Sequence, residues 1–160
     1  MTVDELVAAC AGIGVHVVFL PVGVAGGYVH DIGLIVIDSS LPALEQRAVL
    51  AHEYVHALHG HEGVQDKAVE ARVDRQAAEL LVSPAEYILA ERLYGCDVAA
   101  IAEELELPVW VVAAYQTWLA TQPPEALSDI SNLRESAAPD ALGDAHADES
   151  LLEPAHSPEN

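Results

Sequence analysis

The sequence predicts an α+β fold, with short strands in the N-terminal third and helices in most of the remainder. Residues 15–20 and 33–38 are apolar and rich in β-branched side chains, which is typical of strands. After residue 43 the stretches between Pro and Gly are long enough for helices and contain good helix formers. A block of strands followed by a block of helices is typical of this fold class.

The first half of the chain predicts a helix, a strand, a hairpin and a long helix. A short helix over residues 4–11 is expected to end near Gly12 and Gly14, and residues 15–20 follow as a strand. Residues 28–30 and 33–38 form the predicted hairpin. Ser40 is expected to cap a helix over residues 43–58, which stops at Gly60.

Four further helices are predicted, over residues 64–82, 85–94, 97–105 and 108–120. From residue 122 onward the composition changes, because residues 122–160 contain five of the nine prolines, nine acidic residues and one Arg. The sequence therefore predicts a domain over residues 1–121 and an acidic, disordered tail over residues 122–160.

The charge of the chain argues against nucleic acid as a partner. Its 26 acidic and 6 basic residues give a formal net charge of -20, and such a surface repels a phosphate backbone. Apolar residues make up 52% of the chain, which is enough for a hydrophobic core. A neutral or basic protein is the expected partner.

Neither a membrane nor an oxidising compartment is expected. Residues 6–30 carry no formal charge, but acidic residues flank them, glycines interrupt them and no Lys or Arg lies at either end. The two cysteines, Cys10 and Cys96, are too few for a disulfide framework, so the cytosol is the expected location. Both are expected to pack as small core residues.

The chemistry of the chain centres on residues 52–56, which read H-E-Y-V-H. Positions four apart lie on one face of a helix, so His52 and His56 can bind one metal ion. Glu53 can then act as a general base on a water molecule at that ion. The pattern is typical of zinc peptidases and predicts Zn²⁺ as the cofactor.

A catalytic zinc needs a third protein ligand, and Glu70 is the best candidate because it lies on the next predicted helix, beyond a turn at residues 60–63. Asp74, one helical turn later, is expected to accept a hydrogen bond from one of the ligating histidines. An alternative is that Glu70 and Asp74 belong to a solvated face and pair with Lys67, Arg72 or Arg75.

Other residues near the motif leave alternatives open. Glu62 lies six residues after His56, where a related motif has its third ligand, but that motif needs Gly at position 59 and the chain has His59 there. His59 could line the cleft as a proton donor or lie exposed at the helix end, and His61 is also near.

Residues 47–56 read R-A-V-L-A-H-E-Y-V-H, and residues 70–84 read E-A-R-V-D-R-Q-A-A-E-L-L-V-S-P. Together with the strand over residues 33–38, these segments resemble the ImmA/IrrE family of metallopeptidases of phages and other mobile elements. Val73 and Gln76 depart from the family pattern, which has Ala and an aromatic residue at these positions.

The resemblance implies a zincin-like domain, in which a small mixed or antiparallel sheet lies beside the active-site helix and a helical C-terminal part follows. It implies His52, His56 and Glu70 as zinc ligands and Glu53 as the base. It also implies a zinc metalloendopeptidase in the host bacterial cytosol, with a helix-turn-helix repressor of a phage or mobile element as substrate.

Two further expectations concern the substrate. Residues 33–38 are expected to form an edge strand to which the substrate backbone adds. The group that stabilises the oxyanion is left open among four side chains, Tyr54, His59, Tyr87 and Tyr115.

Two other classes of function compete with the peptidase. One is an inactive protein that keeps the fold and binds the repressor without cutting it. The other is DNA binding through residues 97–119, which resemble a helix-turn-helix. The second helix of that pair has no Lys or Arg to contact phosphates or bases, so packing against the catalytic core is the favoured interpretation.

Overall fold

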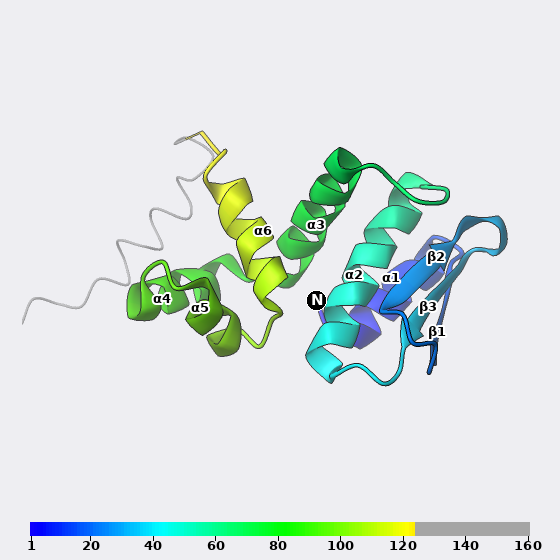
Figure 1. Cartoon of the computed structure of the whole chain (residues 1–160), viewed down its shortest axis with the longest axis horizontal. Helices are drawn as coiled ribbons and strands as arrows, with labels where there is room; N and C mark the ends of the chain where they lie inside the picture. The colour runs from blue at the N-terminus through cyan, green and yellow to red at the C-terminus, as the bar shows by residue number, and fades with distance from the viewer. Residues whose placement is uncertain (124–160) are drawn as a thin grey trace, which may run out of the picture.

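The computed structural model describes residues 1–123 and confirms the α+β class, with a three-stranded sheet and six helices in that part of the chain. Figure 1 shows the sheet with α1 and α2 at one end, α4 and α5 at the other, and α3 and α6 between them. The helices are α1 Val3–Gly12, α2 Ala43–His59, α3 Lys67–Leu81, α4 Pro84–Tyr94, α5 Val98–Glu104 and α6 Val109–Leu119. Each lies within a few residues of its predicted range.

The sheet is mixed, with the strand order β1-β3-β2. Strand β1 (His16–Leu20) runs parallel to β3 (Leu34–Asp38), and β2 (Gly26–Val29) runs antiparallel to β3 on its other side. The predicted hairpin is therefore confirmed, with a single 3-10 turn, His30–Ile32, between its strands. Gly33 closes that turn in the left-handed region, at φ 58°, which glycine adopts without strain.

The prediction that residues 33–38 form an edge strand is wrong, because β3 is the central strand. Ile35 and Ile37 are fully buried, and Asp38 at the end of the strand is buried as well. A strand with neighbours on both sides has few exposed positions, and the nearly continuous apolar run of this segment reflects that. Among residues 1–123, the strand that presents an unpaired edge beside α2 is β2.

Asp38 ties the sheet to the start of α2. Its carboxylate accepts hydrogen bonds from the backbone amides of Gly23 at 3.0 Å and Ser40 at 2.9 Å, and from the Ser40 hydroxyl at 2.7 Å. The backbone amide and hydroxyl of Ser40 are the largest influences that hold the pKa of Asp38 below its ordinary value. The predicted cap at Ser40 is therefore wrong: its hydroxyl satisfies a buried carboxylate, and Pro42 precedes α2 without a side-chain cap.

The core lies between the sheet, α1, α2 and α3, and it continues to α5 and α6. Cys10 on α1 is fully buried, as predicted, and burial raises the pKa of its thiol to about 11. Cys96 is exposed, so its prediction as a core residue is wrong. It follows Gly95, which ends α4, and lies in the short connection to α5.

The structure bears on two further expectations, one about membrane-spanning helices and one about the C-terminal tail. Within residues 1–123, none of the helices combines the length and apolar character that a bilayer span requires. The predicted tail lies almost entirely outside the described residues, so the division at residue 121 stays a prediction.

Gly26 lets β2 approach α2 closely. A Cβ atom at this position would lie 2.7 Å from Cγ1 of Val49 on α2 and 3.0 Å from the carbonyl oxygen of Val36 on β3. At the neighbouring Gly27, a Cβ atom would meet no atom of the described residues within 4 Å. The absence of a side chain at position 26 therefore sets the spacing between the sheet edge and α2.

Gly26→Ala should destabilise the protein by roughly 1–3 kcal/mol, because the added methyl group overpacks a closed interface. Gly27→Ala is the matched control and should change the free energy of unfolding by less than about 0.5 kcal/mol. Urea unfolding of both variants measures the difference. Equal stabilities for the two variants would contradict the close approach of β2 to α2.

Candidate metal centre

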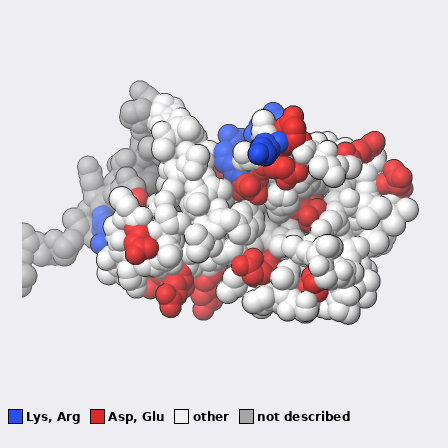
Figure 2. Space-filling model, viewed as in Figure 1, with Lys and Arg blue, Asp and Glu red and all other residues white. Residues whose placement is uncertain are grey.

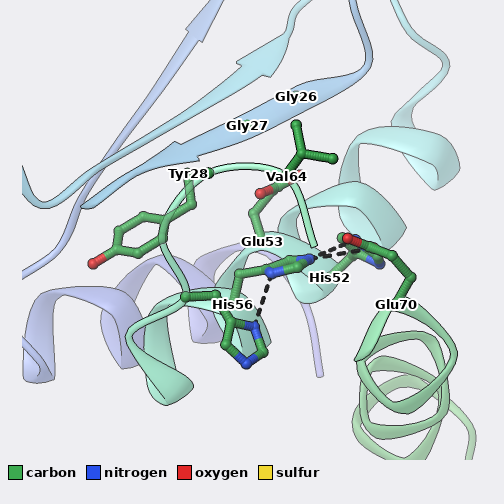
Figure 3. A pocket seen from close by; sticks show the side chains of 10 residues that line it. Gly26, Gly27, Tyr28, His52, Glu53, His56, Val64 and Glu70 are labelled. Carbon is green, nitrogen blue, oxygen red and sulfur yellow. Dashed lines mark hydrogen bonds and ion pairs between the residues drawn. The ribbon is translucent and has the colours of Figure 1, made fainter. Parts of the chain in front are cut away.

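Three donor atoms from two helices converge at one point (Figure 3). His52 and His56 lie one turn apart on α2, and Glu70 lies in the first turn of α3. The two Nε2 atoms are 3.0 Å apart, and the Glu70 Oε2 atom lies 3.3 Å from that of His52 and 3.5 Å from that of His56. The structure thus brings together the three residues predicted as ligands, and in residues 1–123 they are the group that could hold a metal ion.

These separations fit a tetrahedral metal site. Ligand atoms roughly 2.0–2.1 Å from a zinc ion stand about 3.3 Å apart at the corners of a tetrahedron. The three separations in the structure, 3.0, 3.3 and 3.5 Å, lie close to this value. Two imidazole nitrogens and one carboxylate oxygen also form a donor set that zinc and several other divalent ions accept.

Asp74 lies within hydrogen-bond distance of the first histidine. Its Oδ1 atom lies 2.9 Å from Nδ1 of His52, so Nδ1 carries the hydrogen and the lone pair of Nε2 points toward Glu70. Burial is the largest single influence on the pKa of His52 and lowers it, but Asp74, Glu53 and Glu70 together outweigh burial and raise that pKa above its ordinary value. Trp110 of α6 packs edge-on against the ring at a centroid distance of 6.2 Å.

The second histidine has a different partner. Nδ1 of His56 lies 3.0 Å from Nδ1 of His61, in the loop between α2 and α3. Burial and the neighbouring His52 lower the pKa of His56, and Glu70 opposes them. The sequence alone does not predict this contact of His61. The feature of the sequence that could have indicated a role for His61 is Gly60, which ends α2 in a left-handed conformation. The loop of residues 60–66 then turns back over the cleft.

Glu53 lines the same cleft. Burial, the largest influence, raises the pKa of its carboxyl group above the ordinary value, while His52 and the backbone amide of Tyr28 lower it and Glu70 raises it. A carboxylate whose pKa moves toward neutrality is a better proton acceptor near pH 7. The structure places Glu53 in the cleft lining with the two histidines, and its role as a base stays a prediction.

The cleft has a volume of about 410 Å³ and is bounded by four segments. Strand β2 forms one wall, α2 the floor, the α2–α3 loop the opposite wall, and α3 closes one end (Figure 3). The lining residues are Gly26, Gly27, Tyr28, His52, Glu53, His56, His61, Gly63, Val64 and Glu70. An open cleft with titratable groups on its floor is typical of an active site.

Several candidates lie outside the cleft. Glu62 does not join the three donors; its Oε1 atom pairs with Nδ1 of His30 at 3.3 Å. His59 is exposed and bonds to Gln76, with Nε2 2.7 Å from the amide oxygen. Glu70 and Asp74 pair with histidines, and Arg75 pairs with Glu79 at 3.3 Å, so the alternative of a solvated acidic face is not what the structure has.

The tyrosines that were candidates for stabilising the oxyanion also lie outside the cleft lining. Tyr87 and Tyr115 are buried and contact each other at a ring distance of 5.0 Å, and Tyr54 packs against the core. Tyr28 and His61 are the polar cleft residues that remain besides the three donors and Glu53. The departures from the family pattern are accommodated locally, since Val73 is buried and Gln76 bonds to His59.

Comparison with known proteins gives one match. The Peptidase_M78 family model, described as the IrrE N-terminal-like domain, matches residues 10–114. No curated protein and no solved structure matches the chain. The matched residues contain β1, β2, β3, all three converging donors and most of α6. The chain therefore belongs to the Peptidase_M78 family and carries a metallopeptidase domain of the IrrE and ImmA type.

Proposed function

We propose that the chain is a zinc-dependent metalloendopeptidase. The observation that carries the proposal is the convergence of His52, His56 and Glu70, whose ligand atoms lie within 4.8 Å of one another at the base of an open cleft. Three protein ligands leave one position of a tetrahedral zinc for water or substrate, which is the arrangement of catalytic zinc sites.

The residues of the cleft fit peptide hydrolysis. When bound, zinc supplies Lewis-acid chemistry, since it activates a water molecule and polarises the scissile carbonyl group. Glu53 accepts a proton from the attacking water and delivers it to the leaving amine. Asp74 keeps His52 in the tautomer whose Nε2 lone pair faces the site.

The free edge of β2 supports an extended substrate. Residues 26–28 line the cleft, and in the described part of the chain β3 is the strand that pairs with β2. The other edge of β2 therefore has backbone groups available, apart from the Tyr28 amide, which interacts with Glu53. A substrate that adds to this edge passes over Glu53, with Tyr28 and Val64 beside it (Figure 3). An open strand edge admits chain on both sides of the cut bond, which favours cleavage within a chain over removal of a terminal residue.

A helix-turn-helix repressor is the proposed substrate. The family resemblance carries this part of the proposal, and the surface charge is compatible with it. Acidic side chains are spread over the face shown in Figure 2, whereas the basic side chains gather mainly over α3. A basic DNA-binding protein is attracted by such a surface, and free DNA is repelled.

The DNA-binding alternative finds little support. Glu106 adopts a left-handed φ of 50° in the turn between α5 and α6, so the pair does form a tight corner. However, α6 buries Val111, Val112 and Tyr115, and it has no Lys or Arg among its eleven residues. A recognition helix needs an exposed face with such residues.

Incubation with the purified repressor encoded beside the gene of this protein tests the function. We expect cleavage into discrete fragments that stops when a chelator removes the metal and resumes when Zn²⁺ is added. Mass spectrometry of the fragments locates the cut. A stable complex with an intact repressor under all conditions would favour the alternative of an inactive repressor-binding protein.

Glu53→Gln should abolish cleavage while the variant keeps its zinc, because the amide cannot accept a proton and Glu53 is not one of the three donors. A loss of at least about 100-fold in rate is expected. Metal analysis and a fragment assay on the same sample measure both quantities. Glu62→Gln is the matched control and should keep both; full activity of Glu53→Gln would remove Glu53 from the mechanism.

Zinc affinity should depend on pH through His52. The protonated imidazole cannot bind metal, and since carboxylates raise its pKa above the ordinary 6.5, the affinity should begin to fall at a pH above that value. Asp74→Asn removes one of these carboxylates and lowers the pKa of His52, so the fall should begin at a lower pH. The affinity at high pH should drop about 10–100-fold.

Competition with a chromophoric chelator over a pH series measures both effects. The control is Asp31→Asn, which changes an exposed carboxylate beside His30 and outside the cleft lining. An unchanged profile for Asp74→Asn would show that Asp74 does not act on His52 in the metal-bound protein.

A further inference from the structure

We infer that His61 is a positioning residue for His56, because it serves as the neutral hydrogen-bond acceptor that fixes the ring and the tautomer of this proposed ligand. The inference rests on the proposed metal centre. Its basis is the 3.0 Å contact between the Nδ1 atoms of the two rings, at the wall of the cleft.

The ring hydrogens of His56 and His61 can be assigned from their partners. A ligating imidazole presents a lone pair to the metal, so Nε2 of His56 carries no hydrogen and Nδ1 must carry it. Nδ1 of His61 must then accept that hydrogen, which leaves the hydrogen of neutral His61 on its own Nε2. The assignment gives each of the two facing Nδ1 atoms one role, and it requires His61 to be uncharged.

His61 is itself held in place from two directions. Its backbone amide donates to the carbonyl oxygen of His56 at 3.0 Å, directly after the left-handed turn at Gly60. Its ring stacks on that of His59, with centroids 5.3 Å apart and planes inclined by 22°. His59 in turn donates from Nε2 to the side-chain oxygen of Gln76 on α3, at 2.7 Å. A chain of contacts therefore runs from α3 through His59 and His61 to His56.

This series of contacts also gives a role to Gln76. Its side-chain amide provides the acceptor that anchors His59. Because position 76 faces the end of α2, its identity bears on the ring stack that supports His61. Gln76 and the His59–His61 pair thus belong to one arrangement.

The two ligating histidines are consequently held in chemically different ways. His52 donates to a carboxylate, Asp74, and His56 donates to a neutral ring. Glu53, Glu70 and Asp74 already bring three carboxylates to this site. A neutral acceptor at position 61 orients His56 without adding a fourth negative charge, which would be costly in a half-buried position.

Substitutions at position 61 test the inference on the full-length protein. Asn places an acceptor oxygen near the position of Nδ1, whereas Leu has similar bulk and no acceptor. We expect His61→Leu to lower the Zn²⁺ affinity about 10–100-fold and His61→Asn to stay within about threefold of the original protein. His16→Leu on β1, an exposed histidine outside the cleft lining, is the matched control and should leave the affinity unchanged.

A second measurement separates positioning from folding. In zinc-loaded protein, ¹⁵N-detected NMR of the histidine rings should show the Nδ1 hydrogen of His56 protected from exchange, with protection lost in His61→Leu and kept in His61→Asn. Thermal unfolding of the metal-free variants identifies any variant that fails to fold, and His61→Asn provides the comparison in that case.

The outcomes are distinct from those for the proposed function. An affinity of His61→Leu equal to that of the original protein would overturn the inference, as would a folded His61→Asn as weak as His61→Leu. If the unsubstituted protein binds zinc and the His61 variants show the expected differences in affinity, but no substrate is cleaved, the inference stands and the proposed peptidase activity is wrong. An original protein that binds no zinc would overturn both.

Discussion

The site depends on the packing of α3 against α2. Each helix contributes two polar side chains one turn apart, His52 and His56 from α2, and Glu70 and Asp74 from α3. Since both pairs have the same rise along their helices, one side-by-side contact lets Glu70 reach both imidazoles while Asp74 reaches the outer nitrogen of His52.

The helix ends reinforce this arrangement electrically. Glu70 lies in the first turn of α3, where the partial positive charge of the helix terminus favours a carboxylate. His56 lies in the last turn of α2, where the partial negative charge favours a nearby cation. The loop between the two helices therefore joins a terminus that favours a bound cation, at the end of α2, to a terminus that favours the carboxylate ligand, at the start of α3. The same loop also contributes His61.

Much of this site could be predicted from the sequence because its spacing is local. The four-residue interval fixes His52 and His56 on one face, and the turn near Gly60 makes the return of Glu70 and Asp74 a matter of helix packing. His61 could not be predicted in the same way, because its ring direction depends on the left-handed turn at Gly60 and on stacking with His59.

The order of the strands in the sheet also could not be predicted from the sequence. The alternation in residues 33–38 identifies a strand, but which strand becomes central depends on pairings between distant residues. Here β1 pairs with β3, although β2 lies between them in the sequence. The cap at Ser40 failed for a different reason, since the buried carboxylate of Asp38 competes for the same hydroxyl group. Long-range pairing decides the strand order, whereas a contact between residues two apart, with a carboxylate that the fold buries, decides the cap.

The unpaired edge of β2 has a consequence for how copies of the protein behave toward each other. An open strand edge is a template for strands of any chain, including another copy of the same protein, and many proteins block such edges with charged side chains or proline. Here residues 26–27 are glycines, and the edge must remain accessible if substrate binds there. Mutual repulsion between molecules of net charge -20 then provides the protection against self-association that the strand itself lacks.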